Sequence, residues 1–569
     1  MTEWKISCRG ASGAEALRDL DPLLARIYAG RGIEATDSLD LGLRQMLPVR
    51  ELKGTGKAVE RLTEHMQRDS RILIVGDFDA DGATSTALVC KALRNLGHQN
   101  VDFLVPNRFD FGYGLTPQLV AVAIDSRPDL IITVDNGISS IAGSAAAREA
   151  GIDVIVTDHH LPPQELPDAV AIVNPNLDDE TFPSKNLAGV GVAFYLMAAL
   201  AGRHAPPDKA RALVADLLDL VAVGTVADLV PLDRNNRILV EQGLRRIRAR
   251  KCCTGIIALM EQAGRDPRRA VAADLGFYVG PRLNAAGRLD DISVGIRCLL
   301  ADDPSAAREA ADLLGGLNQE RREIEQRMQD QATTAVDALA LDDSGNLPAV
   351  LCLFDPDWHQ GVVGLVASRI KEKVHRPVVA FAADGPDRVK GSARSIPGLH
   401  IRDVLAEVDS RNPELIERFG GHAMAAGLSL SRADLGRFRS CLSQVVEDHL
   451  DPMALTREIL TDGSLDDAQL SLETAELLRH AGPWGQGFPE PLFVDDFRIH
   501  DCRVMKERHL RFRLSRLEGS REISAVAFNQ ADRVAGQRPT CLRLVYRLEV
   551  NEYRGVRSPQ LIAQHIELL

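Results

Sequence analysis

Residues Arg71–Gly82 read RILIVGDFDADG, an apolar run that ends in three aspartates spaced two residues apart. Two further apolar, β-rich runs end in a similar way: Leu130–Val134 (LIITV) leads into Asp135-Asn136-Gly137, and Asp153–Thr157 (DVIVT) leads into Asp158-His159-His160. Helix-like segments separate these runs, and this alternation predicts βαβ units with a parallel sheet. Ligands bind beyond the carboxyl ends of such strands, so we expect the polar side chains to meet there.

A fourth acid, Asp228, closes another apolar, β-rich run, Leu217–Ala227, inside a region (206–250) that otherwise reads as helical. Several carboxylates packed together repel one another and lose solvation unless a cation lies between them. Oxygen ligands with one or two imidazoles suit Mn²⁺ or Mg²⁺. For DFDADG two alternatives stay open: a polar turn that caps the next helix, and a calcium loop, although the glutamate required at its twelfth position is Leu88 here.

The rest of the chain predicts an α/β protein of several domains. We expect an N-terminal extension (1–45), a parallel-sheet catalytic domain (46–302), a long connecting helix (303–340), a second α/β domain (341–462) and a linker with a small OB-like β-barrel (463–569). The barrel is expected from five short alternating strands after a turn-dense linker. Their expected bounds are Leu492–Val494, His509–Leu514, Ile523–Phe528, Leu542–Leu548 and Gln560–Ile566.

Composition limits the setting in which the protein works. The nine scattered cysteines and the absence of an export signal in MTEWKISCRG predict a reduced, cytoplasmic protein. The apolar run Leu187–Gly202 is too short for a membrane span and predicts a buried helix. The net charge of −13 argues against non-specific duplex binding, but residues 491–569 carry 14 basic against 10 acidic side chains. A groove for a single strand therefore remains compatible with the charge.

Several motifs in this order resemble the DHH phosphoesterase superfamily. DFDADGATST, VDNG, VTDHH and VADLVPL are similar to its motifs I to IV, and GSARS and GGHAMAAG are similar to its associated DHHA1 domain. PNRFDFGYGL (106–115), PRLNAAGR (281–288) and the C-terminal barrel extend the likeness, over nearly the whole chain beyond residue 45, to the RecJ family of bacterial exonucleases.

The resemblance implies roles for particular residues. Its metal ligands fall on Asp77, Asp79, Asp135, His159 and Asp228. His160 would orient water or phosphate, Arg288 would stabilise charge on the scissile phosphate, and Asp81 and Asp158 would either bind metal or support the ligands. Some relatives carry a histidine where this chain has Val75, which bears on the coordination of one metal. The DNA contacts would come from Arg108, Tyr113, Gln319, Ser392, Arg394, Gly420, Gly421 and His422.

Simpler structural roles stay open for several of these residues. A surface salt bridge for Arg288, a solvated strand for Ser392 and Arg394, a core position for Tyr113 and a solvated helix face for Gln319 are the alternatives.

The function implied by the resemblance is a two-metal exonuclease that degrades single-stranded DNA from its 5′ end to 5′-mononucleotides, in repair and recombination. Its expected partners are single-stranded DNA, a single-strand-binding protein and a RecQ-type helicase, with no membrane, and the expected oligomeric state is a monomer. Two alternatives are a phosphodiesterase of short oligonucleotides or cyclic dinucleotides, and a non-catalytic DNA-binding scaffold. All the acids of motifs I to IV are present, which favours activity over the scaffold.

Overall fold

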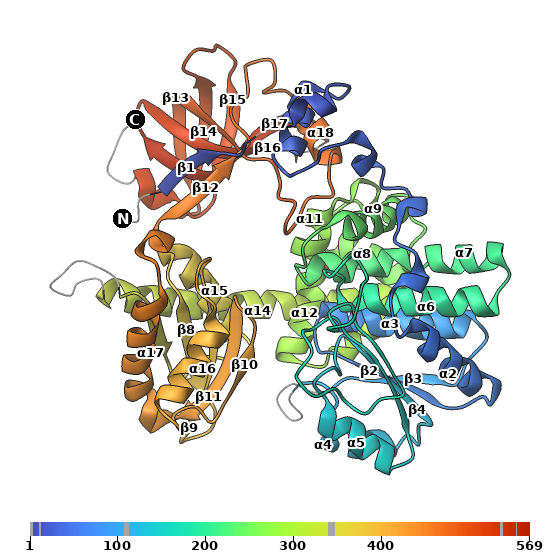
Figure 1. Ribbon diagram of the computed structural model, residues 1–569. Helices are drawn as coiled ribbons and strands as arrows, with labels where there is room; N and C mark the ends of the chain where they lie inside the picture. The colour runs from blue at the N-terminus through green and yellow to red at the C-terminus, as the bar shows by residue number, and fades with distance from the viewer. Residues whose placement is uncertain (1–3, 11–12, 107–112, 340–347, 535–538, 554) are drawn as a thin grey trace. The chain divides into compact units, whose positions relative to one another are not determined.

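The protein divides into two compact units in the computed structural model, which describes residues 4–10, 13–106, 113–339, 348–534, 539–553 and 555–569. One unit contains Met1–Ser7 and Gly316–Ile459, and the other contains Cys8–Gly315 and Leu460–Leu569. The long helix α14 (Pro304–Leu339) supplies residues to both units, as the sequence predicts for a connecting helix (Figure 1).

A five-stranded parallel sheet forms the centre of the second unit, with strand order β3-β2-β4-β5-β6. Helices cover both of its faces (Figure 1), so β2 and β4 are buried along their whole length. One face packs a cluster that includes Leu73, Val75 and Ile131 against residues of α4 and α5, while α3 and α6 lie on the other face. The strands are β2 (Ile72–Gly76), β3 (Val101–Leu104), β4 (Leu130–Val134), β5 (Asp153–Thr157) and β6 (Ala171–Val173). The predicted parallel sheet is therefore confirmed.

Helices that follow these strands, or pack beside them, complete the second unit. Their bounds are α2 (Thr55–Gln67), α3 (Ala80–Asn95), α4 (Pro117–Ile124), α5 (Ile141–Glu149), α6 (Gly189–His204), α7 (Pro207–Ala215), α8 (Leu218–Ala227), α9 (Arg234–Arg248), α10 (Thr254–Gln262), α11 (Ala272–Asp274), α12 (Gly280–Leu289) and α13 (Ser293–Leu300). The β-rich reading of Leu217–Ala227 is wrong, because this run forms α8 and Asp228 is the C-terminal cap of that helix. Periodicity cannot separate a buried strand from a buried helix when every position is apolar.

The apolar run from Leu187 forms α6, and its first ten residues are all buried. This outcome agrees with the prediction of a core helix. Within the described residues, no helix combines the length and the apolar character needed to cross a membrane.

The N-terminal region is bound to the linker that precedes the barrel. In α1 (Pro22–Ala29), the ring of Tyr28 stacks on Trp484 and Phe488, and its hydroxyl donates to the Ala481 carbonyl at 2.8 Å. Beyond α1, Arg31 makes two hydrogen bonds to the Asp462 carboxylate, at 2.6 and 3.1 Å. Both side chains of this ion pair are only 1% exposed.

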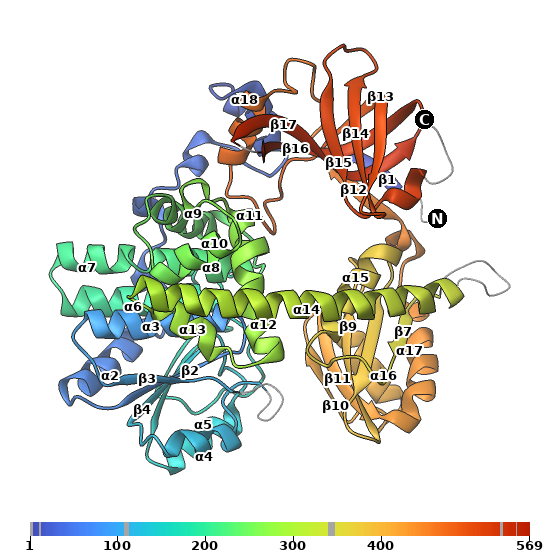
Figure 2. The ribbon, with the colours of Figure 1, turned by 180° about the vertical axis from the view of Figure 1, so that it is seen from behind.

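The first unit contains the predicted second α/β domain. Its sheet has the order β10-β11-β9-β8-β7, in which only the β7–β8 pair is parallel (Figure 2). Helices α16 and α17 bury an apolar cluster that includes Phe381 and Phe438. The elements are β7 (Leu351–Phe354), α15 (Val363–Val374), β8 (Val378–Ala383), β9 (Arg388–Arg394), α16 (Ile401–Arg411), β10 (Arg418–Gly421), β11 (Ala425–Ser431) and α17 (Leu435–His449). A short ribbon of β1 (Trp4–Cys8) and β12 (Arg457–Thr461) lies at the boundary of the two units along the chain.

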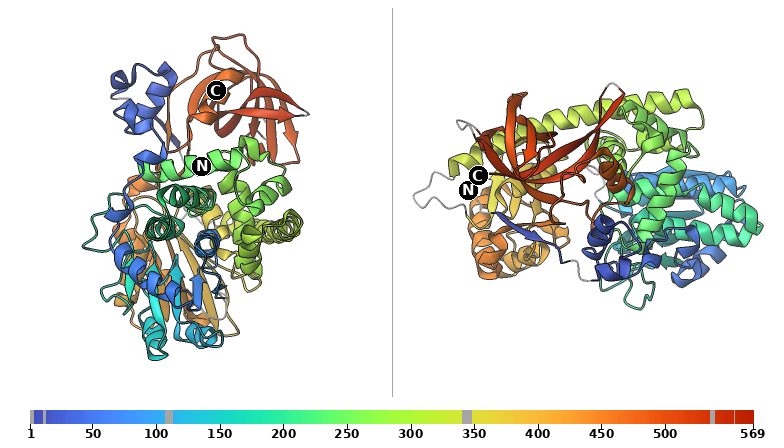
Figure 3. Two further views of the ribbon diagram at one scale, coloured as in Figure 1. Left: turned by 90° about the vertical axis from the view of Figure 1, so that its right-hand side faces the viewer. Right: turned by 90° about the horizontal axis from the view of Figure 1, so that it is seen from above.

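The C-terminal strands close into a barrel in the order β13-β14-β15-β17-β16 (Figure 3). Helix α18 (Leu472–His480) precedes it and packs on β16. The strands are β13 (Phe493–Met505), β14 (His509–Arg516), β15 (Ile523–Ala527), β16 (Cys541–Tyr553) and β17 (Val556–Leu568). The five-stranded barrel is confirmed, although three strands run for 13 residues, beyond the short alternating stretches that were predicted.

Arg31→Ala should destabilise the second unit strongly, because it removes both guanidinium hydrogen bonds to the buried Asp462 carboxylate and leaves the more distant Arg9 Nε atom, 3.9 Å away, as its remaining cation. We expect the free energy of unfolding to fall by about 3–5 kcal/mol, measured by denaturant unfolding. Arg44→Ala is the matched control, since Arg44 pairs with Asp40 at the surface with its side chain 82% exposed, and it should cost less than about 1 kcal/mol. Equal losses for the two variants would contradict a structural role for the Arg31–Asp462 pair.

Candidate metal centre

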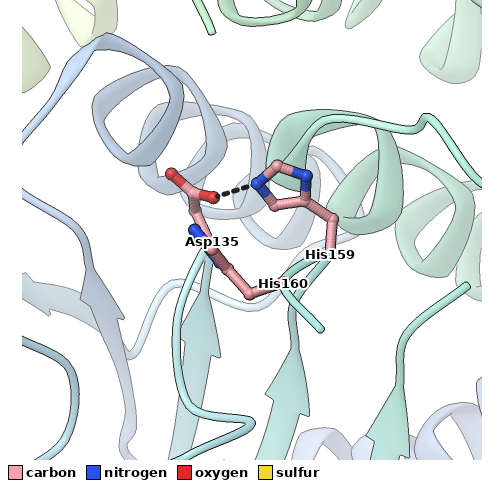
Figure 4. A group of neighbouring side chains, drawn as sticks. All are labelled: Asp135, His159 and His160. Atoms are coloured by element: carbon pink, nitrogen blue, oxygen red, sulfur yellow. Dashed lines mark ion pairs between the residues drawn. The ribbon is translucent and has the colours of Figure 1, made fainter. Parts of the chain in front are cut away.

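Two acids and a histidine, each following one of three adjacent strands, meet at one edge of the parallel sheet. Asp77 follows β2, Asp135 follows β4 and His159 follows β5. The His159 Nε2 atom lies 3.2 Å from Asp135 Oδ1 (Figure 4) and 3.6 Å from Asp228 Oδ2 at the end of α8. Three overlapping groups each place their ligand atoms within 4.8 Å of one another: Asp77, Asp79 and Asp135; Asp135, His159 and His160; and Asp81, His159 and Asp228. The fold therefore brings together all five residues expected to bind metal.

Asp79 also caps a helix. Its Oδ1 accepts hydrogen bonds from the backbone N–H groups of Asp81 at 2.9 Å and Gly82 at 3.0 Å, at the first turn of α3. The Asp79 carboxylate therefore caps α3, as the helix-cap interpretation of DFDADG predicts, and it also belongs to the acidic cluster. The position of this acid is fixed by the start of the helix, before any ligand binds.

Asp135 has a strained backbone, with φ of 61° in the left-handed region. A non-glycine residue there costs about 1–3 kcal/mol and persists where the surroundings enforce it. The N-terminus of α6 presses against this residue, because a Cβ atom on Gly189 would lie only 2.5 Å from the Asp135 side chain. The Asp135 Oδ1 atom is buried and accepts no hydrogen bond from any residue that the structure describes.

Asp81 joins the acidic loop to the same helix. One carboxylate oxygen accepts a hydrogen bond from Gly189 N at 2.7 Å and the other accepts one from Val190 N at 2.9 Å. Both oxygens are therefore engaged by the N-terminus of α6, where the helix dipole favours negative charge. This geometry favours the supporting role for Asp81 over that of a ligand.

The buried carboxylates of the cluster need a nearby positive charge to be stable in the ionised form. Burial, together with the neighbouring carboxylates, raises the pKa of Asp135 and of Asp228 well above the usual aspartate range. Burial and the charge of Asp79 raise the pKa of Asp81 to about 7. These carboxylates resist ionisation in the absence of a cation. Oxygen donors around one imidazole, with a buried and unsatisfied Asp135 oxygen among them, fit Mn²⁺ or Mg²⁺.

Asp158 and His160 form a pair beside the cluster. The buried Asp158 carboxylate accepts hydrogen bonds from Ile138 N at 2.9 Å and from His159 N at 2.7 Å, and it lies 2.7 Å from His160 Nδ1. Burial alone would raise the pKa of Asp158, but the hydrogen bond and charge of His160 hold that pKa below its usual range. Burial would lower the pKa of His160, and the Asp158 partner raises it overall. Asp158 is absent from the three ligand groups and instead orients the histidine pair.

Tyr113 lies against this pair. Its hydroxyl donates to the Asp135 carbonyl at 3.1 Å and lies 3.2 Å from His160 Nδ1, while its ring meets Phe78 and His160 edge to face. Tyr113 is 46% exposed, so the core alternative is wrong. Arg108, the other predicted contact on this loop, lies outside the described residues.

Helix α12 braces the acidic loop from the opposite side. Asn284 Oδ1 accepts a hydrogen bond from Ala80 N at 2.8 Å, and a Cβ atom on Gly287 would lie 1.8 Å from the Phe78 carbonyl oxygen. Arg288 follows directly on this helix and is half-buried. Arg288 was predicted from NAAGR, but Asn284 was not, although it is a polar residue one helical turn before Arg288.

The predicted contacts of the DHHA1-like domain gather in the first unit. Cross-strand register aligns Gly420 with Gly427, and Gly427 with Ser392, so the three lie in one row across β10, β11 and β9. Arg394 donates to Ser392 Oγ at 2.8 Å and to Ser368 Oγ at 3.1 Å. Gly421 has φ of 139° and precedes His422 in the turn between β10 and β11.

Two other predicted positions lie away from these clusters. Gln319 is exposed on α14 and donates to Glu323 on the same helix face, at 3.1 Å. Val75 is fully buried in the apolar cluster beneath α4 and α5, and therefore in the core.

Comparisons with known proteins agree with this architecture. Family models match as the N-terminal domain of the DHH family (71–225), the DHHA1 domain (347–448) and the RecJ OB domain (461–565). The single-stranded-DNA-specific exonuclease RecJ of Salmonella typhimurium is 52% identical over 97% of each chain. The protein of the same name from Bacillus subtilis is 34% identical and covers 98% of this chain and 70% of that protein.

Solved structures show the same fold. The crystal structure of RecJ from Thermus thermophilus in complex with Mn²⁺ matches with a TM-score of 0.80 and 31% identity, covering 99% of this chain and 79% of that chain. The Mg²⁺ complex of RecJ from the same organism matches with a TM-score of 0.75 and 30% identity, covering 99% and 78%. With the acidic cluster, the DHHA1 domain and the barrel all present in order, the chain belongs to the RecJ family of single-stranded-DNA-specific exonucleases.

Proposed function

We propose that this protein is a metal-dependent exonuclease that degrades single-stranded DNA in the 5′→3′ direction and releases 5′-mononucleotides. The single observation that carries the proposal is the convergence of Asp77, Asp79, Asp135, His159 and Asp228 at one edge of the sheet. Membership of a family whose relatives are named single-stranded-DNA-specific exonucleases supports the exonuclease activity and the single-stranded substrate.

Asp77, Asp79, Asp135, His159 and Asp228 would hold two divalent ions, Mn²⁺ or Mg²⁺. Such ions polarise a phosphoryl oxygen and lower the pKa of water, which generates a nucleophile at neutral pH. The chain supplies the rest by positioning and charge. His160, held by Asp158, presents its ring edge toward Tyr113 and can orient the attacking water or a phosphate oxygen. Arg288, fixed by the packing of α12, would stabilise negative charge on the scissile phosphate.

The direction of digestion would follow from an anchor for the 5′ end. Arg394 and Ser392 are already joined by a hydrogen bond, and a Cβ atom on Gly364 would lie 2.7 Å from Arg394 Nη2 and 2.9 Å from Ser392 Oγ, so a side chain at position 364 would displace this pair. A guanidinium, a hydroxyl and the glycine-rich turn at Gly420-Gly421-His422 are groups that bind a terminal phosphate. Arg108 and Tyr113 would guide the first nucleotides, and Gln319 would contact the strand further on.

The barrel would track the strand beyond the active site. Arg503 and Arg511 are exposed and directly opposite each other in the β13–β14 register. Arg503 Nε is already paired with Asp501 Oδ2 at 2.8 Å, whereas Arg511 forms no ion pair with the residues that the structure describes and faces the like charge across the strand pair. Arg543 differs, because its Nε and Nη2 atoms donate to the two oxygens of Asp496 at 2.8 and 3.1 Å. Its charge is therefore already compensated.

We place the enzyme in DNA repair and recombination, as a monomer in the bacterial cytoplasm near the nucleoid. A single-strand-binding protein and a RecQ-type helicase would supply its substrate. We also propose that the catalytic domain comprises residues 46–302 and that the second α/β domain comprises residues 341–462. The alternative of a phosphodiesterase for short oligonucleotides is less favoured, because the barrel offers a cationic surface that a dinucleotide does not need.

Asp79→Ala should abolish digestion while the chain stays folded, because the change removes one member of the Asp77–Asp79–Asp135 group. Strands labelled at the 5′ or the 3′ end and duplex DNA are incubated with Mn²⁺, Mg²⁺ or EDTA. The parent chain should digest only single strands, from the 5′ end, and only with metal. Asp102→Ala is the control, since Asp102 lies on β3 with its side chain 60% exposed. Near-parental digestion by Asp79→Ala would refute the metal assignment.

Metal binding should release protons, because the pKa of Asp135 and that of Asp228 are raised in the metal-free protein. A carboxyl group that holds its proton more tightly in the folded than in the unfolded chain stabilises the fold less as the pH rises. The melting temperature of the metal-free protein should therefore fall as the pH rises above about 4, the pKa of an aspartate in the unfolded chain, and Asp81, with its pKa of about 7, contributes to this fall. Saturating Mn²⁺ should reverse this fall, and its gain should grow with pH. A Mn²⁺ gain that is independent of pH would contradict the raised pKa values.

Arg511→Ala should weaken binding to long oligonucleotides and reduce the slope of log affinity against log salt by about 1. Arg543→Ala is the matched control on the same barrel and should leave the slope unchanged, since Asp496 already balances its charge. Binding is measured by fluorescence anisotropy in EDTA, so cleavage does not interfere. The same slope in the parent and in Arg511→Ala would remove this face of the barrel from the DNA path.

A further inference from the structure

Asparagines follow the fifth strand of the parallel sheet, whereas acids follow strands β2, β4 and β5. Strand β6 (Ala171–Val173) pairs with β5 and is followed by Asn174-Pro175-Asn176, which we call the amide loop. The loop lies at the same sheet edge as the acidic cluster, since parallel strands share their carboxyl ends. Its position next to the histidine pair gives it access to the backbone of that pair.

Each asparagine of the amide loop holds one carbonyl group of the histidine pair. Asn176 Nδ2 donates to the His159 carbonyl oxygen at 2.6 Å, and Asn174 Nδ2 donates to the His160 carbonyl oxygen at 2.9 Å. Two successive peptide groups are therefore fixed from one side. From the other side, Asp158 Oδ1 accepts hydrogen bonds from the N–H groups of His159 and His160, at 2.7 and 3.1 Å, and restrains the same segment.

The amide loop is itself rigid. Asn174 is completely buried, and its Oδ1 accepts a hydrogen bond from Asn176 N at 2.8 Å. Lys185 Nζ donates to the Pro175 carbonyl at 2.7 Å and to the Glu180 carbonyl at 2.8 Å. Pro175 fixes φ between the two asparagines. The donors are thus oriented before they meet the histidine backbone.

We propose that Asn176, oriented by Asn174, is a positioning residue that sets the direction of the His159 imidazole toward the metal ions, an inference that rests on the proposed function. The ring leaves the chain between the His159 N–H group, held by Asp158, and the His159 carbonyl group, held by Asn176. Its Nε2 atom lies 3.2 Å from the Asp135 carboxylate (Figure 4) and 3.6 Å from the Asp228 carboxylate. A rotation of the peptide group on either side of the His159 Cα atom would swing Nε2 away from both acids. Acids at these two positions would serve poorly, because a carboxylate has no proton to donate to a carbonyl and would add negative charge to the cluster.

The test measures Mn²⁺ affinity in the full chain by electron paramagnetic resonance, together with DNA cleavage at saturating Mn²⁺. Asn176→Ala should weaken Mn²⁺ binding by about 10- to 100-fold, as expected when a group that orients a metal ligand is lost. Saturating Mn²⁺ should restore part of the cleavage rate. Asn176→Ser, a milder change, provides a folded variant if the alanine substitution reduces the yield, and it should show a loss in the same direction.

Asn235→Ala is the control for loss of an asparagine that makes side-chain hydrogen bonds away from the metal centre: Asn235 is buried, whereas Asn176 is half-buried, and Asn235 Oδ1 accepts from Leu47 N and from the Tyr195 hydroxyl, both at 3.1 Å. It should lower the melting temperature of the metal-free protein by a similar amount and leave Mn²⁺ affinity unchanged. Equal Mn²⁺ affinity in Asn176→Ala, Asn176→Ser and the parent would overturn the positioning role. If the parent chain itself fails to bind Mn²⁺ or to cut DNA, the proposed function fails instead.

Discussion

The carboxylates at one edge of the parallel sheet repel one another, and the surrounding strands and helices must hold them together against that repulsion. Burial and mutual charge hold the pKa of Asp135 and of Asp228 well above the usual range, so the fold keeps these groups together against their own electrostatics. Packing has to supply the force that opposes this repulsion. The buried strands β2 and β4 and the helices on both faces of the sheet provide it.

The acids that create the repulsion also take part in the packing. Asp79 caps α3, and Asp81 binds the N-terminus of α6 with both of its oxygens. Helix N-termini carry partial positive charge, so each of these contacts offsets part of the negative charge at the site. A single motif of six residues therefore starts one helix, docks a second and contributes to the acidic cluster. A substitution in this motif changes both the packing of the helices and the charge of the cluster. The effects on catalysis and on stability must therefore be measured separately for each acid.

The sequence could predict the parts of the site in which the local pattern and the final position agree. Asp77, Asp135 and His159 each follow a short apolar run with clear strand character, and the rules for parallel sheets bring such ends together. Asp228 was harder, because an uninterrupted apolar run such as Leu217–Ala227 fits a buried strand or a buried helix equally well. Asp228 was therefore placed in the cluster correctly, but as the end of a strand and not of a helix. The partners of residues distant in the chain were beyond prediction: the position of Asn284 one turn before Arg288 does not reveal that it contacts Ala80, about two hundred positions away, and Asn174 and Asn176 resemble ordinary turn residues.

Adjacent histidines pose a geometric problem that side-chain contacts alone do not solve. His160 Nδ1 is directed to Asp158, whereas His159 Nε2 is directed to Asp135 and Asp228, with the two ring centroids 4.5 Å apart. Two neighbouring side chains can keep such different targets only if the backbone between them does not rotate. N–H groups held by Asp158 on one side and carbonyls held by the amide loop on the other provide that restraint. The precision of the metal centre therefore depends on neutral hydrogen bonds to the backbone as much as on the charged groups that would bind the ions.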